Sequence, residues 1–595
     1  MLRHFACLLL LIIILPVSAA EPPLGTRITE LTLPDVVTGK TWSLLEQGRE
    51  AKAVIVVFLG TECPVSNAYV PTLLALEKEY RSQGVLLVGI NSNAHETTES
   101  LTKHAKEYDI TFPILQDTSG TIAERFHAER LPTAYVLDGS RTVRYQGRID
   151  DQFERSIKRP QPTSNDLKDA LKAVLADKEV VHSSTKVVGC PINREGRKKA
   201  TKTDAQTITY SKQVSRILQQ HCQYCHRAGE VGPFQLNTYQ DALAWSGAIR
   251  EVVSDNIMPP WLADPKHGTF ANDRRLPAED KQTLLHWIDA GCPEGNKADL
   301  PAPKQYVQGW NIGQPDEIMT MNEEVKVPAQ APKAGIPYKH LFVGKPFTED
   351  RYVQAAEVRP GYRGVVHHII VYILRPGQKL SILEGVGNPI LFFANPDIPE
   401  QLVGYVPGDQ AYVLPEGQAK LIPKGSQLAF ELHYTPNGKA GVDCSTLGLS
   451  YAKTKPKHII RGDAAINWTF RIPPNASAHK IVADFDFERP VMLLAMSPHM
   501  HLRGKDFEFR LRYPGGKEEI LLNVPRYDFN WQQAFILKEP KLIPKGSKMI
   551  CTAHFDNSKE NPNNPDPSKR VVWGEQTWDE MMIGFFEYYQ VRPGK

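Results

Sequence analysis

The chain has 595 residues, far more than one hydrophobic core supports, so several domains are expected. Its 70 Lys and Arg nearly balance its 67 Asp and Glu, which leaves no basic field to hold nucleic acid or an anionic membrane. Eight cysteines are too few for a disulfide scaffold in a chain of this length and indicate specific chemistry instead.

The first 20 residues have the pattern of a secretory signal peptide. Arg3 precedes an apolar run from about Phe5 to Val17, and the small residues SAA follow it. The run is too short to span a bilayer. We therefore expect an exported chain, secreted or periplasmic, with a cleaved signal peptide and no stable membrane span. A retained N-terminal anchor is the alternative.

Residues 21–185 alternate strand-like and helix-like runs, including AVIVVFLG, NAYVPTLLALEKEYRSQG and VLLVGINS. This alternation predicts an α/β domain in which helices cover a central sheet. Cys63 lies between a buried strand and a helix, where the helix dipole lowers the pKa of a thiol. With Pro132 ahead of the strand TAYVLD, the segment resembles the redoxin (peroxiredoxin and thioredoxin-like) family, which implies a thioredoxin-like fold with a cis proline at 132.

The segment departs from both main motifs of that family. Ser66 occupies the position at which a C-x-x-C pair needs its second cysteine, and Thr61 is one residue too close to Cys63 for the T-x-x-C of peroxidases. Dithiol exchange within one motif is therefore excluded, and Cys190 is a candidate resolving partner. Cys63 is a candidate catalytic thiol. A front domain that serves only docking or stability is the competing hypothesis.

A basic polar linker is expected at 186–205, and three runs with helical periodicity predict an all-α domain at 206–300. Within this domain, HCQYCHRAGEVGPF places Cys222, Cys225 and His226 in the order C-x-x-C-H. Two thiols at this spacing can form thioethers to one haem, and the next residue then becomes an axial ligand of the iron.

Met258, in IMPPWLA, is the candidate sixth ligand, because the two prolines that follow hold it in a rigid turn. Ligation by His and Met suits electron transfer. The alternatives are a structural disulfide or a zinc site, for which only His221 is a further ligand near in sequence. The segment resembles class I cytochrome c domains, which implies a covalently bound haem c.

A Pro-rich linker is expected at 301–337, and beyond it short alternating strands are separated by Gly and Pro turns. Seven residues, KLIPKGS, occur at 420–426 and again at 541–547, and each copy continues into a strand that ends near a histidine. A duplicated domain is the simplest explanation of this repeat. We predict two related all-β, jelly-roll-like sandwiches, at 338–470 and 471–595.

His367 and His368 are adjacent at the start of the strand HHIIVYIL. Neighbours in a strand face opposite sides, so the pair is better suited to holding a metal at a strand end or bulge than to building a core. His433, at the end of the first repeat strand, is a candidate third imidazole. The competing interpretation is that these histidines cap strands or hydrogen-bond within the core.

His499 and His501, two apart in MSPHMHLRG, point to one face and can bind one ion together. Met581 adds a soft thioether, which favours copper. Met582 is expected to pack in the core because it follows Met581 on a strand. His554, at the end of the second repeat strand, is an alternative to Met581 as a ligand.

Together these motifs resemble the copper type II, ascorbate-dependent monooxygenases, the family of peptidylglycine-hydroxylating and dopamine β-monooxygenases. The resemblance implies two copper ions, one that relays electrons and one at which oxygen reacts. The implied ligands are His367, His368 and His433 for the first ion, and the catalytic His499, His501 and Met581 for the second.

We predict a copper-dependent monooxygenase that hydroxylates a C–H bond of an unidentified organic substrate with O2. Its electrons would come through the attached haem c from an unidentified donor, because a covalently attached cytochrome acts at high effective concentration. Two other classes of function stay open. One is a non-catalytic electron-transfer or copper-binding protein, and the other is a thiol peroxidase or disulfide oxidoreductase that acts through Cys63.

Overall fold

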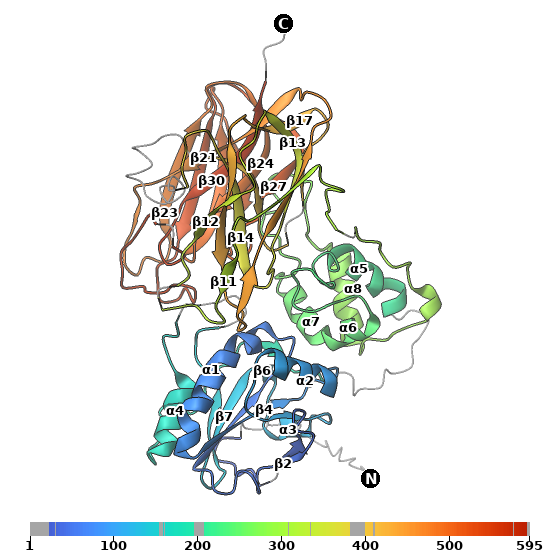
Figure 1. The fold of residues 1–595 in the computed structure, drawn as a ribbon, viewed down its shortest axis with the longest axis vertical. Coiled ribbons are helices and arrows are strands. Elements are labelled where there is room, and N and C mark those ends of the chain that lie inside the picture. The colour runs from blue at the N-terminus through green and yellow to red at the C-terminus, as the bar shows by residue number, and fades with distance from the viewer. Residues whose placement is uncertain are drawn as a thin grey trace, which may run out of the picture.

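The structure, a computed structural model, describes residues 23–29, 31–153, 159, 161–194, 208–307, 309–333, 335–380, 399–408, 411–574 and 576–591. The predicted signal peptide and part of the predicted linker 186–205 lie outside these residues. Figure 1 shows a front domain at one end of the molecule, the β-rich domains at the other end and a helical module beside them. No helix among the described residues combines the length and the apolar character needed to cross a membrane.

The front domain is built on a five-stranded sheet in the order β5-β4-β3-β7-β8. All six residues of β3 are buried, as expected for a strand that is covered on both faces. The predicted thioredoxin-like α/β fold is confirmed, and the peptide between Leu131 and Pro132 is cis as predicted. The elements of this domain are β1 (Thr32–Pro34), β2 (Thr41–Ser43), β3 (Ala53–Phe58), α1 (Pro64–Tyr80), β4 (Val85–Asn91), α2 (Thr98–Glu107), β5 (Ile114–Gln116), α3 (Thr121–Arg125), β6 (Arg130–Leu131), β7 (Thr133–Asp138), β8 (Val143–Gly147), α4 (Asp166–Leu175) and β9 (Cys190–Pro191).

The helical module follows, and each of the three predicted helical runs is helical. The second run is broken at Trp245, where α6 ends and α7 begins. The module has its own core, at the centre of which Trp287 is fully buried. Its elements are the π-helix η3 (Tyr210–Val214), α5 (Ser215–His221), α6 (Tyr239–Ala244), α7 (Ser246–Ser254) and α8 (Ala278–Asp289).

The first sandwich packs two sheets around a core that draws apolar side chains from both. One sheet has the order β12-β18-β14-β15 and the other contains β10-β20-β13-β17, with β16 on β13. Its elements are β10 (Glu317–Thr320), β11 (Val325–Val327), β12 (Lys339–Val343), β13 (Arg351–Arg359), β14 (Val366–Leu374), β15 (Glu400–Tyr405), β16 (Tyr412–Val413), β17 (Gln418–Ile422), β18 (Gln427–Tyr434), β19 (Gly441–Asp443) and β20 (Thr446–Tyr451).

The second sandwich repeats this arrangement around a separate core. One sheet has the order β23-β28-β25-β26 and the other contains β21-β30-β24-β27. Its elements are β21 (His458–Ile466), β22 (Arg471–Ile472), β23 (His479–Asp486), β24 (Val491–His499), β25 (Gly504–Arg512), β26 (Glu518–Val524), β27 (Phe535–Ile543), β28 (Lys548–Phe555), β29 (Val571–Val572) and β30 (Ile583–Gln590).

The sandwich boundaries differ from those expected. Strands β10 and β11 lie within the predicted linker 301–337, and β21 begins at His458, ahead of the expected boundary at 470. Pro315 precedes β10 and Pro328 follows β11. Prolines are tolerated at strand ends because no ladder hydrogen bond is lost there. The two prolines that suggested a linker therefore lie at the ends of two short strands.

The two KLIPKGS copies adopt the same structure. The N–H of Phe347 donates to Ser426 O at 2.9 Å, and the N–H of Phe487 donates to Ser547 O at 2.9 Å. The strands that follow, β18 and β28, occupy equivalent places in the two four-stranded sheets. The fold therefore contains the duplication that the repeat indicated.

The two sandwiches share one sheet. Strands β17 and β21 pair in parallel, with Gln418 opposite His458 and Ala419 opposite Ile459. This pairing joins the outer sheets of the two sandwiches into a nine-stranded sheet within the described residues. The relative position of the two domains is thus set by backbone hydrogen bonds.

A buried lysine reinforces this junction. Lys420, the first residue of the first repeat, is 1% exposed. Its ammonium group donates to Glu587 Oε1 at 2.6 Å, to Leu402 O at 2.8 Å and to Gln401 O at 3.1 Å. Because Glu587 lies on β30 of the second sandwich, this ion pair crosses from one domain to the other.

The helical module is docked on the second sandwich through the chain that follows α7. The N–H of Asp264 donates to Asn523 O and the N–H of Ala271 donates to Ile536 O, both at 2.8 Å. The rings of Trp261 and Phe270 pack against Phe535 with centroids 5.0 and 5.6 Å away. Both aromatic residues belong to the core of the second sandwich, so the module is fixed to it.

Replacing Lys420 by Met should destabilise the sandwich junction by about 3 kcal/mol, because it leaves the carboxylate of Glu587 without its buried cation. The repeat supplies a matched control in Lys541, whose partner Glu519 is 40% exposed. Lys541→Met should cost about 1 kcal/mol or less. Calorimetric unfolding of both variants checks this, and equal losses would contradict the role assigned to Lys420.

Candidate metal centres and thiol site

The three histidines of the first predicted copper site converge. One ligand atom from each of His367, His368 and His433 lies within 4.8 Å of the others. His368 and His433 are cross-strand neighbours on β14 and β18, and the register shifts between Val366 and His368. This bulge is the feature expected from the adjacent histidine pair, since it lets two neighbouring residues serve one site.

Burial favours the neutral forms of His368 and His433. His433 Nδ1 is buried and makes no hydrogen bond to any described residue. Burial, followed by the charge of neighbouring histidines, lowers the pKa of His368 and of His433 well below the usual range. Neutral imidazoles offer the nitrogen lone pairs that bind copper, so the donor set fits a copper ion.

The second predicted site lies at the end of β24. The ring centroids of His499 and His501 are 5.3 Å apart. In the ladder between β24 and β30, His499 pairs with Ile583, and Met581 lies two residues before Ile583. The ladder ends at this pair, so His501 and Met581 both lie just beyond it, on the two chain segments that form it.

Glu580 holds the loop that carries His501. Its buried carboxylate accepts hydrogen bonds from the N–H of His501 at 2.8 Å and from the N–H of Arg503 at 2.6 Å. Burial raises the pKa of Glu580 to about 8, while the charge of Arg503 acts in the opposite direction. The next residue, Met581, is 7% exposed, and Met582 is fully buried in the core, as expected for a packing residue.

Gln532 selects the ring nitrogen that His499 presents. His499 Nδ1 lies 2.6 Å from Gln532 Oε1. Because an amide oxygen only accepts hydrogen bonds, Nδ1 carries the proton and Nε2 is left as the ligand atom. Burial lowers the pKa of His499 to about 4 although the hydrogen bond to Gln532 raises it.

In the second repeat, Asp506 and His554 occupy the positions that His368 and His433 have in the first. They are also cross-strand partners next to a register shift. His554 Nδ1 is 2.6 Å from Asp506 Oδ1. This hydrogen bond engages the His554 ring, which favours Met581 over His554 as the third ligand of the second site.

The two histidine clusters face each other across Phe529. The Phe529 ring stacks on His367 with centroids 4.8 Å apart and an interplanar angle of 17°. Its centroid is 5.9 Å from that of His501. The charges of His499 and His501 contribute to the low pKa of His368, after burial and the charge of His433. The clusters therefore form one continuous region.

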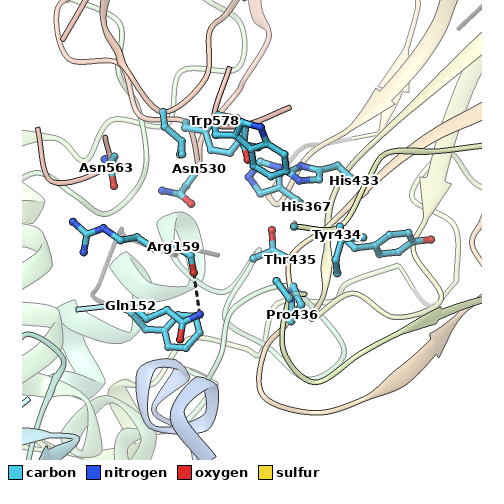
Figure 2. A pocket seen from close by; sticks show the side chains of 17 residues that line it. Gln152, Arg159, His367, His433, Tyr434, Thr435, Pro436, Asn530, Asn563 and Trp578 are labelled. Atoms are coloured by element: carbon cyan, nitrogen blue, oxygen red, sulfur yellow. Dashed lines mark hydrogen bonds between the residues drawn. The ribbon is translucent and has the colours of Figure 1, made fainter. Parts of the chain in front are cut away.

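A cavity of about 90 Å³ opens onto the first cluster. Figure 2 shows His367 and His433 in its wall, with Trp578 beside them. Gln152 and Arg159 of the front domain line the opposite side. Three domains thus enclose one cavity, and the front domain restricts access to the histidines.

The C-x-x-C-H segment has the features that a covalent haem requires. Cys222 and Cys225 are thiols. His226 Nδ1 donates to Phe234 O at 3.1 Å, which leaves Nε2 for an iron ion. A Cβ at Gly232 would lie 2.8 Å from His226 Nδ1 and 2.7 Å from Cys225 O, so only glycine permits this approach. These residues fit a haem c.

The zinc alternative rests on His221 as a further ligand. His221 Nε2 is 3.2 Å from Asp280 Oδ2. Within the described ranges, only His367, His368 and His433 form a group of three or more close His, Cys, Asp or Glu ligands. Met258 lies after α7, ahead of a cis peptide to Pro259. Its role as sixth iron ligand stays a prediction.

The structure brings Cys63 and Cys190 together. Cys63 caps the N-terminus of α1, where its Sγ accepts a hydrogen bond from the N–H of Ser66 at 3.5 Å. Cys190 pairs with Leu131, whose carbonyl oxygen is 3.5 Å from Cys63 Sγ. Burial raises the pKa of Cys63, but hydrogen bonds from Cys190 and Ser66 outweigh it and lower the pKa to about 7.

Aromatic contacts connect the thiol site with the haem motif. Trp245 Nε1 donates to Glu62 Oε2, next to Cys63, at 3.2 Å. The Trp245 ring stacks on Phe234 with centroids 3.8 Å apart and an interplanar angle of 9°. The Phe234 centroid is 4.6 Å from that of His226. The front domain and the helical module therefore meet at their candidate functional residues.

Comparison with known proteins identifies a family match for the front domain. Residues 24–146 match the AhpC/TSA family. This segment is a redoxin domain of that family. Thiol-disulfide oxidoreductase ResA of Halalkalibacterium halodurans is 30% identical over 89 residues, 15% of this chain and 49% of that protein. The resemblance to redoxins is thereby confirmed for the front domain.

The chain has curated relatives of a second kind. DBH-like monooxygenase protein 1 of Gallus gallus is 22% identical over 259 residues, 39% of this chain and 40% of that protein. The chain therefore spans less than half the length of each of these two curated relatives.

A solved structure also matches part of the chain. The crystal structure of a hypothetical protein of Sinorhizobium meliloti 1021 is 32% identical, covers 28% of this chain and 93% of its own, and has a TM-score of 0.26.

Sequence reasoning missed several residues of the site. Phe529 and Gln532 lie in a loop with no motif. Tyr338, whose ring centroid is 4.7 Å from that of His433, is the first residue of the predicted first sandwich and belongs to no motif. Only Glu580 carried a signal, as an acidic residue directly ahead of Met581. The partner of a loop residue is set by the tertiary fold. Such a residue belongs to no periodic sequence pattern, so the sequence alone does not identify it.

We expect iodoacetamide to modify Cys63 with a pH midpoint near 7, measured by mass spectrometry of the Cys63 peptide, because hydrogen bonds stabilise its thiolate. Cys190→Ser should raise this midpoint by weakening one of these bonds. Cys551→Ser is the control, since Cys551 is buried in the second sandwich. A midpoint near 9 in the unmodified protein would contradict the assignment.

Proposed function

We propose that this chain is an exported copper-dependent monooxygenase that hydroxylates a C–H bond of an organic substrate with O2 and receives its electrons through an attached haem c. The observation that carries the proposal is the convergence of His367, His368 and His433 within 4.8 Å, opposite a second buried histidine pair. The similarity to DBH-like monooxygenase protein 1 supports it.

Ten side chains would hold the cofactors. The first copper would be held by His367, His368 and His433, the second by His499, His501 and Met581, and the haem by Cys222, Cys225, His226 and Met258. When bound, copper supplies one-electron chemistry and activation of O2, and haem c supplies a one-electron carrier.

The protein's own residues prepare this site. Burial keeps the imidazoles neutral at physiological pH, so no proton has to leave before a metal binds. Gln532 holds the proton of His499 on Nδ1, and Glu580 fixes the loop beside Met581. The cavity borders His367 and His433 of the first site, and Phe529 in its wall lies between it and His501 of the second site.

The purified mature protein should contain one haem and two copper ions. His433→Ala should remove one copper, because two imidazoles alone hold the ion weakly. His554→Ala is the matched control from the second repeat and should retain both ions. Metal analysis and haem spectroscopy provide the measurement. Zinc in the sandwiches, or loss of copper from both variants alike, would argue against the proposal.

A thiol-based activity of the front domain is the second proposal. It is supported by the contact between Cys63 and Cys190, by the lowered pKa of Cys63 and by the match to the AhpC/TSA family. In this case Cys63 would act as the nucleophile and Cys190 as the resolving thiol. The β-domains would then only transfer electrons.

Two substitutions separate these functions. Met581→Ala should abolish substrate-dependent oxygen consumption and product hydroxylation while the haem spectrum persists, because it removes the soft ligand of the second site. Cys63→Ser should leave this activity nearly unchanged. The opposite pattern, in which Cys63→Ser abolishes activity and Met581→Ala does not, would support the thiol function and reject the copper one.

A further inference from the structure

One short loop touches all three predicted cofactor sites. It comprises residues 529–533, between β26 and β27. At its start, the Phe529 ring stacks on His367 at 4.8 Å. Near its end, Gln532 Oε1 lies 2.6 Å from His499 Nδ1. At its end, Gln533 Nε2 donates to Pro260 O at 2.9 Å, in the segment that carries Met258.

Trp531, in the middle of this loop, lies next to the haem motif. Both border the space beside Gly408, which has a φ of +82°. A Cβ at Gly408 would lie 3.5 Å from Cys225 Sγ, 3.5 Å from Arg274 Nη1 and 3.8 Å from the Trp531 ring. The sulfur expected to attach the haem and the Trp531 ring are therefore both close to the position that a side chain at 408 would occupy.

The loop is held rigidly. The N–H of Trp531 donates to Asp528 O at 2.9 Å, and Gln533 is 2% exposed. Just before the loop, the Tyr527 hydroxyl donates to Met500 O at 2.7 Å, between the two histidines of the second site. Its contacts to the haem motif and to the histidines are therefore kept at fixed distances.

We propose that loop 529–533 is the electron path from the haem to both copper ions, with Trp531 as its entry point; this inference rests on the proposed function. Electron transfer through protein weakens steeply with distance, and gaps between atoms weaken it more than covalent bonds do. From Trp531 the chain leads in one direction through Gln532 to His499, and in the other through the Phe529 ring to His367.

The transfer is balanced without any other reactant. One electron leaves ferrous haem, which becomes ferric, and reduces one cupric ion to the cuprous state. No bond forms or breaks, and no proton has to move. Because the path branches at Trp531, a single donor site serves two metal centres that would each need one electron per turnover.

The first test measures electron transfer without substrate or O2. The haem of copper-loaded protein is reduced photochemically, and its reoxidation is followed by absorbance while loss of the Cu(II) signal is followed by EPR. Trp531→Leu should slow both by an order of magnitude or more with haem and copper contents unchanged, and Trp531→Phe should retain most of the rate. Trp468→Leu is the control, because Trp468 packs on Trp573 in the same sandwich.

A second variant tests the branch to His499. Gln532→Leu should slow reduction of the second copper and leave the first, bound by His367, unaffected. In protein without metals, the same variant should shift the imidazole nitrogen resonances of His499 measured by NMR, since Nδ1 loses its acceptor. This second readout requires neither cofactor and remains available if Trp531→Leu does not fold.

The possible outcomes distinguish the proposed electron path from the proposed monooxygenase function. Unchanged transfer rates in Trp531→Leu and Gln532→Leu, with normal haem and copper contents, would overturn the electron path and leave the monooxygenase proposal intact. Failure of the unmodified protein to bind haem or copper would overturn both. Slower transfer in Trp531→Leu but not in Trp468→Leu supports the path.

Discussion

The parallel pairing of β17 with β21 is the constraint on which the candidate site depends. It joins two sandwiches that each have a complete core of their own, and the buried ion pair between Lys420 and Glu587 crosses the same junction. Because backbone hydrogen bonds fix the two domains in register, the two histidine clusters face each other at a set distance. A flexible linker between the sandwiches would leave that distance undefined.

The candidate redox groups follow one line through the molecule. The contact of Cys63 with Cys190 lies beside Glu62 and Trp245, and Trp245 stacks on Phe234 next to the haem motif. From there the loop 529–533 continues to both histidine clusters. Three of these contacts cross domains, namely Trp245 with Glu62, Gln533 with Pro260 and Phe529 with His367, so the arrangement depends on how the domains dock.

The sequence predicted what is local and repeated. The α/β alternation, the helical runs and the duplicated turn are periodic, and the adjacent pair His367 and His368 correctly indicated a bulge at the start of β14. It did not predict β10 and β11, which are too short to show a period. It named Cys190 as a candidate partner of Cys63 but did not predict the two-residue strand β9 that brings the two together, or the role of Gln532.

Trp261 and Phe270 of the helical module pack in the core of the second sandwich, so the two domains share part of one core. A helical module cut out at its own ends would display two bare aromatic side chains and would leave Phe535 facing an empty recess. Such a fragment would be prone to aggregate. The helical module and the second sandwich are therefore complementary at this interface, and each depends on the other to cover its apolar surface.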